Sequence, residues 1–150
     1  MIIINAENQV LGRMASFAAK RALIGESVIV VNAEKALVSG KKEVVLRDCS
    51  RRLGIRNWGN PKRGPYMMKR PDMFVRKTIR GMLPWSKNRY GSRARDAFKN
   101  ILVFIGVPDE EIKKLDKNFD RSQIINMKTK NLKNCLKVEE LCAFMGWKKW

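Results

Sequence analysis

The sequence predicts an α/β fold whose first strands run parallel. Residues 2–4 and 28–31 are short runs of Ile and Val, which favour buried strands covered on both faces. Between them, residues 11–23 place apolar or small side chains at the i, i+3, i+4 spacing of one helical face, and Gly25 is a typical helix stop. Strand, helix and strand in this order predict a βαβ unit with parallel strands and a right-handed connection.

The next elements follow from apolar spacing and turn residues. A short apolar run at residues 36–38 precedes an expected helix over residues 41–53, for which Ser39 is the expected N-cap. Residues 54–70 have neither the helical nor the strand period and contain three glycines and two prolines. This composition predicts a long loop, and loops of this length within a domain are usually functional or disordered.

The second half of the chain starts with a helix expected over residues 71–83. Pro71 suits its first turn, and Gly81 and Pro84 suit its end. No clear period is present in residues 116–136. The other expected elements are a basic loop at 85–93, a short helix at 94–100, a strand at 101–105, a helix beginning at the acids 109–111, and a helix at 138–145.

Length and composition favour one globular domain. The chain has 150 residues, of which 45% are hydrophobic, which is enough for a single core. We therefore expect one α/β domain over residues 1–150, with a basic insertion at 51–95 and a C-terminal appendage at 116–150. The formal net charge is +18. Positive charges in such excess repel one another and destabilise the compact state, which favours an anionic partner. Nucleic acid is the leading candidate.

The basic insertion carries most of this charge. Residues 51–95 contain 14 Lys and Arg side chains and a single acid, Asp72, whereas solvated faces usually mix both signs. Arg outnumbers Lys ten to four, and the guanidinium fork can hold two phosphate oxygens at once. The cations lie mainly in Gly- and Pro-rich segments without a known DNA-binding spacing, which favours RNA over DNA.

Aromatic side chains are interleaved with these cations. Trp58, Tyr66, Trp85 and Tyr90 suit stacking on unpaired bases, although a core position is an alternative for each, most strongly for Trp85. Arg76 and Arg80, four residues apart, are expected to form a rigid clamp on backbone phosphates. The candidate RNA-binding residues are Lys41, Lys42, Arg51, Arg52, Arg56, Trp58, Lys62, Arg63, Tyr66, Lys69, Arg70, Arg76, Lys77, Arg80, Lys87, Arg89, Arg93 and Arg95.

Lys41 and Lys42 form a weaker candidate. They follow Gly40 at an expected helix start, where they could hold one phosphate, but a solvated helix start explains them equally well. The same stretch departs from a P-loop, because Lys35 stands where the first glycine would be and Lys42 where the Mg²⁺-binding hydroxyl would be. No dinucleotide fingerprint follows the first strand, so we expect no cofactor.

Other site classes have little support. The chain has no histidine, which removes the usual catalytic triads, and its carboxylates are explained by helix starts or ion pairs. The three cysteines lack metal-ligand spacing and indicate a reducing compartment. No apolar stretch near twenty residues is present, so we expect no membrane span or export signal. We expect neither a catalytic centre, a metal site nor a small-molecule substrate.

One segment carries a family resemblance. The stretch GPYMMKRPDMFVRKTIRGMLPW, residues 64–85, resembles the archaeal and eukaryotic branch of the universal large-subunit ribosomal protein 13 family. VVNAEKALVSGKK (30–42), LGRMAS (11–16) and FIGVP (104–108) support the resemblance in the same order. The loop RRLGIRNWGNP, residues 51–61, departs from bacterial members, which have a histidine-containing segment there.

The resemblance implies a three-layer α/β/α sandwich around a mostly parallel four-stranded sheet. It also implies a structural, non-catalytic role in the cytoplasmic ribosome: binding large-subunit ribosomal RNA, contacting neighbouring large-subunit proteins and supporting assembly. Two alternatives stay open. An RNA-processing nuclease predicts a carboxylate cluster near the strand ends, and a DNA-compacting protein predicts equal binding to duplex DNA and structured RNA.

Overall fold

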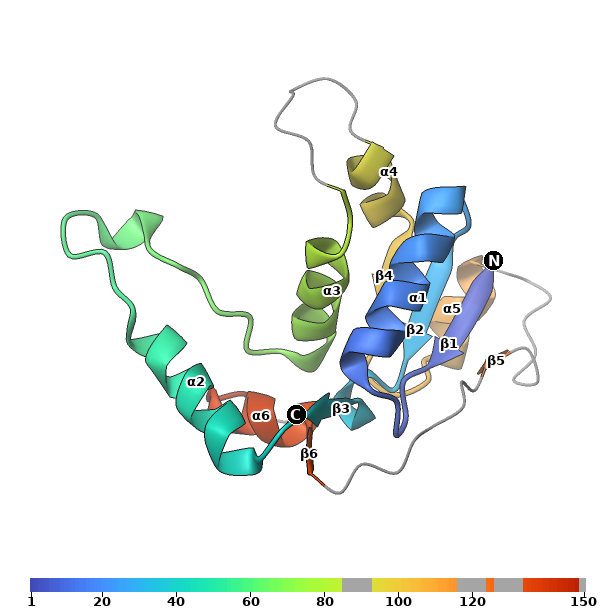
Figure 1. Ribbon diagram of the computed structural model, residues 1–150. Helices are drawn as coiled ribbons and strands as arrows, with labels where there is room; N and C mark the ends of the chain where they lie inside the picture. Colours follow the sequence, from blue (N-terminus) through green and yellow to red (C-terminus); the bar gives the residue numbers. More distant parts are fainter. Residues whose placement is uncertain (85–92, 116–123, 126–133, 149–150) are drawn as a thin grey trace.

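A computed structural model describes residues 1–84, 93–115, 124–125 and 134–148 (Figure 1). Two short 3-10 helices, η1 (Ala33–Lys35) and η2 (Pro61–Arg63), accompany the main elements. In chain order these are β1 (Ile2–Asn5), α1 (Leu11–Ile24), β2 (Val28–Val31), β3 (Leu37–Ser39), α2 (Lys42–Gly54), α3 (Pro71–Gly81), α4 (Arg93–Lys99), β4 (Ile101–Val103), α5 (Asp109–Leu115), β5 (Ile124–Ile125), β6 (Cys135–Lys137) and α6 (Val138–Phe144).

The main sheet has four parallel strands in the order β4-β2-β1-β5. Ile3 lies opposite Ile29 in the β1–β2 pair, and Val28 lies opposite Ile101 in the β2–β4 pair. The predicted βαβ unit with parallel strands is confirmed, as is an α/β fold around a mostly parallel four-stranded sheet. The fourth strand, β5, falls in the region for which the sequence predicted no element.

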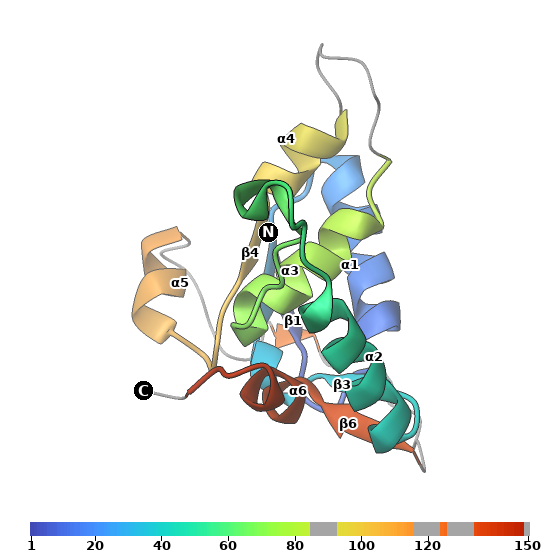
Figure 2. The same ribbon diagram turned by 90° about the vertical axis from the view of Figure 1, so that its left-hand side faces the viewer.

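Both faces of the sheet are covered by helices, which explains the unbroken Ile and Val runs. Alternate residues of a strand point to opposite faces. Ile4 and Val30 belong to the larger core cluster, to which α1, α3, α4 and α6 contribute. Ile3 and Val31 belong to a smaller cluster with Ile112 of α5. Figure 2 shows α5 on the side of the sheet away from α1 and α3.

A second, two-stranded sheet pairs β3 with β6 in antiparallel fashion. The apolar run at 36–38 therefore forms a strand outside the main sheet. Next to this small sheet, α6 contributes buried side chains to the larger cluster, including Leu141 and Cys142. Ser39 lies inside β3, and α2 begins after Lys41 without a side-chain cap, so the expected Ser39 cap is wrong.

The strand expected at 101–105 is also shorter than predicted. The backbone N–H of Phe104 still donates to the carbonyl of Val30 at 2.8 Å, but the chain then turns at Gly106, whose φ is +69°. After this turn the carbonyl of Gly106 accepts from the N–H of Asn32 at 2.9 Å. The turn thus joins the carboxyl ends of β2 and β4, where a polar network lies.

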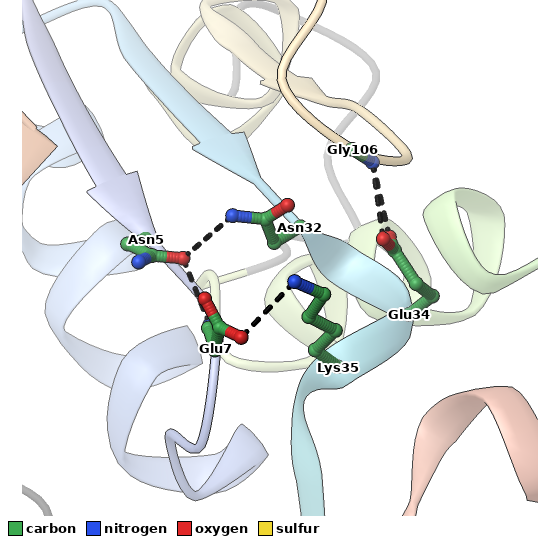
Figure 3. A network of polar contacts seen from close by, with 6 residues as sticks. All are labelled: Asn5, Glu7, Asn32, Glu34, Lys35 and Gly106. Atoms are coloured by element: carbon green, nitrogen blue, oxygen red, sulfur yellow. Dashed lines mark hydrogen bonds and ion pairs between the residues drawn. The ribbon is translucent and has the colours of Figure 1, made fainter. Parts of the chain in front are cut away.

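This network ties the carboxyl ends of β1 and β2 together (Figure 3). Asn32 has a left-handed backbone with φ +56°, which Asn tolerates better than most residues. Its side-chain amide donates to Asn5 Oδ1 at 3.0 Å, and the same oxygen accepts from the backbone N–H of Glu7 at 3.0 Å. Lys35 Nζ forms an ion pair with Glu7 at 3.0 Å, so strand ends and η1 are linked by side chains.

Glu34 of η1 extends the network into the interior. Its side chain is buried, and both carboxylate oxygens accept from the backbone N–H of Gly106, at 3.1 and 3.3 Å. A buried carboxylate is costly unless it is paired or hydrogen-bonded. Here it anchors the turn after β4 to the turn after β2.

Replacing Glu34 with Ala should therefore destabilise the fold. The substitution leaves the N–H of Gly106 without its acceptor, and loss of a hydrogen bond to a charged group costs about 1.5–3 kcal/mol. Urea denaturation measures this free energy of unfolding. Glu7→Ala is the matched control, because its ion pair with Lys35 is about half exposed and should contribute at most about 1 kcal/mol. Equal losses in the two variants would contradict the anchoring role of Glu34.

The buried thiol of Cys142 makes stability depend on alkaline pH. Burial raises the pKa of this thiol to about 12 from an ordinary value of 9.0, with Cys49 and Asp72 as smaller causes. A group whose pKa is higher in the folded state stabilises the fold below the unfolded pKa. That stabilisation is lost as the pH rises from about 9 towards 12.

We therefore expect the Cys142→Ala variant to lose less stability than the wild type between about pH 9 and pH 11. The unfolded thiol releases its proton first, which costs the wild type up to about 1.4 kcal/mol per pH unit. Urea midpoints measured across this range give the two slopes. If the two curves run parallel with a constant offset, the substitution has removed only side-chain packing. That result would refute the titration effect.

Candidate nucleic-acid interface

Residues 42–70 form a projecting segment, called the arm below. Figure 1 shows α2 leading away from the rest of the chain and the loop after it returning to the start of α3. Within α2, only Cys49 is fully buried, and Val45, Leu46 and Leu53 are partly buried against the core. The loop contains one turn of 3-10 helix, η2, and residues 55–60 are all exposed. The arm is therefore anchored along one side of α2 and solvated beyond it.

Exposed basic side chains are concentrated on the arm. It contains nine basic side chains and two acidic ones, Glu43 and Asp48. All nine basic side chains are exposed: Lys42, Arg47, Arg51, Arg52, Arg56, Lys62, Arg63, Lys69 and Arg70. Their like charges are not neutralised within the arm, so the arm is a positively charged surface that attracts anions. Arg47 was not among the predicted residues, because it lies just before the single-signed stretch.

Four large apolar or aromatic side chains of the arm are also exposed. Trp58 is 90% exposed, Tyr66 75%, Ile55 55% and Val44 42%. Of the two interpretations left open for Trp58 and Tyr66, a core position is therefore wrong, and stacking of the rings on RNA bases stays a prediction. Trp85 and Tyr90 lie outside the described residues. Exposed aromatic side chains among cations are the combination that stacks on bases and tracks a phosphate backbone.

Two arginines of the arm form ion pairs. Arg70 makes a two-pronged contact with Asp72 at 3.0 and 3.2 Å, and Arg51 lies 3.8 Å from Asp48. The Arg side chains of these pairs are 60% and 75% exposed. The Arg51–Asp48 pair is exposed at both side chains, so it contributes little, typically under about 1 kcal/mol. The side chain of Asp72 is only 17% exposed, so its two-pronged contact holds Arg70 more firmly. Arg51 is therefore the guanidinium group that can exchange its carboxylate for a phosphate at low cost.

Lys41 and Lys42 lie at the start of α2, as predicted, and both are exposed. Lys42 Nζ pairs with Glu140 of α6 at 3.1 Å. Lys41 precedes the first turn and makes no side-chain cap. The arrangement fits a solvated helix start tied to α6 as well as it fits a phosphate contact.

The two arginines expected to form a clamp on α3 lie in different environments. Arg76 is partly buried, and its guanidinium stacks on the ring of Phe98 in α4, 4.6 Å from the ring centre. Arg80 is exposed. Between them, Lys77 donates to the backbone carbonyl of Tyr66 at 3.1 Å, which ties the returning loop to α3. Arg76 therefore packs α4 against α3, whereas Lys77 positions the arm.

Arg93 also serves the fold. Its Nε and Nη2 donate to the carbonyl of Leu23 at 3.2 and 2.8 Å, which satisfies an acceptor at the carboxyl end of α1. Arg95, on the same helix, is exposed. Lys87 and Arg89 lie outside the described residues. Arg93 thus ties the start of α4 to the end of α1.

A hollow of about 450 Å³ lies in the arm loop, between the end of α2 and the residues after η2. The sequence did not single out its lining as a unit, although the aromatic Trp58 next to Asn57 was a signal. The lining residues are Leu53, Ile55, Arg56, Asn57, Trp58, Gly64 and Pro65. Within the described part of the chain, no group of three or more Cys, Asp or Glu side chains could hold a metal ion. No described helix could cross a membrane.

The fold and this surface define a basic α/β protein that presents cations and aromatic side chains on an arm. A sequence model described as ribosomal protein L13 matches residues 1–110. The chain therefore belongs to the ribosomal protein L13 family, archaeal branch, because the similar proteins are archaeal.

Three relatives illustrate the match. Each is named large ribosomal subunit protein uL13. The Sulfurisphaera tokodaii protein is 40% identical over 147 residues, covering 97% of this chain and 94% of the relative. The Methanococcus maripaludis protein is 46% identical over 110 residues, covering 73% and 77%. The Methanopyrus kandleri protein is 44% identical over 106 residues, covering 71% of this chain and 62% of the relative.

Replacing Arg93 with Ala should lower stability even without RNA. The variant leaves the carbonyl of Leu23 without its donor, and a hydrogen bond from a charged group contributes about 1.5–3 kcal/mol, less at an exposed site. Arg56→Ala is the matched control, because Arg56 is exposed on the arm and should change stability by less than about 0.5 kcal/mol. Thermal and urea unfolding measure both. An unchanged unfolding midpoint for Arg93→Ala would contradict the structural role of Arg93.

Proposed function

We propose that this protein is a structural constituent of the large ribosomal subunit that binds ribosomal RNA and supports subunit assembly. One observation carries the proposal: in a chain of the L13 family, all nine basic side chains of the arm are exposed beside exposed aromatic rings. The names of the relatives point to the same particle.

The arm would act as the main RNA surface. Guanidinium groups hold phosphate oxygens in pairs, and exposed rings stack on unpaired bases. The cations proposed to engage phosphates there are Arg51, Arg52, Arg56, Lys62, Arg63, Lys69 and Arg70. Arg80 and Arg95 extend this surface along α3 and α4. Binding of RNA would offset the entropy of ordering the loop.

Lys41, Lys42, Arg76, Lys77 and Arg93 have a second role in this proposal. They lie near the RNA surface but already have structural positions at a helix start, against Phe98, on Tyr66 and on Leu23. They would hold the surface in shape and add attraction for phosphates at longer range. Contacts with neighbouring large-subunit proteins and a cytoplasmic, ribosome-bound location follow from the same proposal.

The role proposed is non-catalytic. The membership of the L13 family favours it over a nuclease, and the exposed arm on an α/β body favours irregular RNA over a DNA duplex. Divalent-metal-dependent RNA cleavage by the purified protein would support the nuclease instead. Equal competition by duplex DNA and structured ribosomal RNA would support the DNA-compacting alternative.

The affinity for large-subunit ribosomal RNA should fall steeply with salt. If about 6 to 8 phosphates are engaged, the dissociation constant should rise about a thousand-fold or more between about 50 and 200 mM salt. The Arg56→Ala/Arg63→Ala double variant should lower the slope of the log–log plot by about two. Filter binding or fluorescence anisotropy measures the slope.

Lys113→Ala/Lys114→Ala is the matched control for this double variant. It removes the same charge from α5, which lies on the other face of the sheet from α3, and both lysines are exposed. We expect the control to keep a slope close to that of the wild type. A salt-independent dissociation constant, or equal slopes for the two double variants, would contradict the arm as the RNA surface.

Cosedimentation tests the particle itself. The native protein should sediment with large ribosomal subunits and stay bound through a moderate salt wash, because several contacts must break together. Sedimentation as a free small protein under these conditions would refute the ribosomal assignment. This result is independent of which residues make the contacts.

A further inference from the structure

The hollow in the arm loop has the size of a small-ligand site. Its volume of about 450 Å³ lies within the range of about 300–1,000 Å³ typical of such sites. It is larger than the hollow of about 210 Å³ between α2 and α3. Both sides of the loop line it, with Leu53 and residues 55–58 on one side and Gly64 and Pro65 on the other. A flat group could enter between them.

The lining chemistry selects a planar, heteroaromatic occupant. The indole of Trp58 and the side chains of Leu53, Ile55 and Pro65 provide apolar contact surface. The amide of Asn57 brings both a hydrogen-bond donor and an acceptor, which matches the polar edge of a nucleobase. An aliphatic ligand would leave that amide without a complementary partner.

The charge around the hollow selects an occupant attached to an anionic chain. Arg56 lines the hollow and is exposed, and Arg52, Lys62 and Arg63 lie within a few residues of the lining and are exposed too. A base within an RNA strand is attached to a sugar-phosphate backbone, whose phosphates would lie next to these cations. Bases within an A-form helix keep their faces stacked, so only an unpaired base can offer a face to Trp58.

We propose that this hollow binds a single unstacked base of the RNA. Trp58 stacks on the face of the base, Asn57 hydrogen-bonds its edge, and Arg56 holds an adjacent phosphate. The proposal rests on the proposed function and deepens it, because it divides the arm into phosphate contacts and one base contact. In the free protein Trp58 is 90% exposed, so the indole face is open to a base.

Short oligonucleotides separate the base contact from phosphate contacts. The probes are a twelve-residue oligoadenylate RNA and an abasic oligomer with the same sugar-phosphate backbone, so that both carry the same charge. At one moderate salt concentration, the wild type should bind the base-bearing oligomer roughly tenfold or more tightly than the abasic one. Fluorescence anisotropy measures both affinities.

Two variants and a control test the assignment to Trp58. Trp58→Ala should remove the preference for the base-bearing oligomer, and Trp58→Phe should keep most of it, because an aromatic face is retained. Lys62→Ala should weaken the binding of both oligomers by the same factor, since Lys62 is exposed on the arm but does not line the hollow. Trp58 is nearly fully exposed, so unchanged thermal unfolding of Trp58→Ala confirms that its fold is intact.

Equal binding of both oligomers by the wild type would overturn the proposal, and would leave the hollow to an apolar side chain of a neighbouring protein. A preference that persists in Trp58→Ala would overturn it too. Neither result contradicts the proposed function, which is tested by cosedimentation and by the salt dependence of ribosomal RNA binding. If the protein neither cosedimented with large subunits nor bound ribosomal RNA in a salt-dependent way, the ribosomal assignment itself would be refuted.

Discussion

Burial of one stripe of α3 is the constraint on which the presentation of the arm depends. Pro71, Val75 and Ile79 recur every fourth residue of α3, Leu83 follows two residues after its end, and all four are buried. Burying the last three contributes roughly 1.5–3 kcal/mol each. The arm returns to the amino end of this helix (Figure 1). Because the stripe fixes α3 against α1 and the sheet, the arm ends on a rigid support.

The arginines divide according to how firmly the fold holds them. Arg51 pairs with Asp48 at an exposed site, so a phosphate can replace that partner at little cost. Arg76 and Arg93 are tied to an aromatic ring and a helix-end carbonyl, and moving them would loosen α4. Arginine thus attracts anions on the arm, whereas at Arg76 and Arg93 it holds α4 in place. Charge counting alone cannot separate the two, because the separation depends on which element lies opposite each guanidinium.

Local patterns predicted the elements that local interactions determine. The βαβ unit and α3 could be predicted from the spacing of apolar side chains, from Gly25 at the end of α1 and from Pro71 at the start of α3. Each of these signals depends on residues within about one helical turn. The two-residue strand β5 could not be predicted, because Ile124–Ile125 is a strand only through its pairing with β1. The cap expected from Ser39 failed because β6 draws that residue into a sheet. For the candidate interface, the cations of the arm and Trp58 are exposed, as a binding surface requires, and their contact with RNA stays a prediction. The contact of Arg76 with Phe98 escaped it, since the two residues lie on different helices.

The order of the strands has a consequence for synthesis. Ribosomes make proteins from the amino end, so β1, β2 and β4 can pair before β5 exists. Until Ile124–Ile125 emerges, one edge of β1 lacks its final partner, and until Cys135–Lys137 emerges β3 lacks β6. Open strand edges are templates for wrong pairing. The chain therefore passes through a stage in which its cationic arm is already complete while both sheets are still unfinished, and chaperones or early contact with RNA would matter most at that stage.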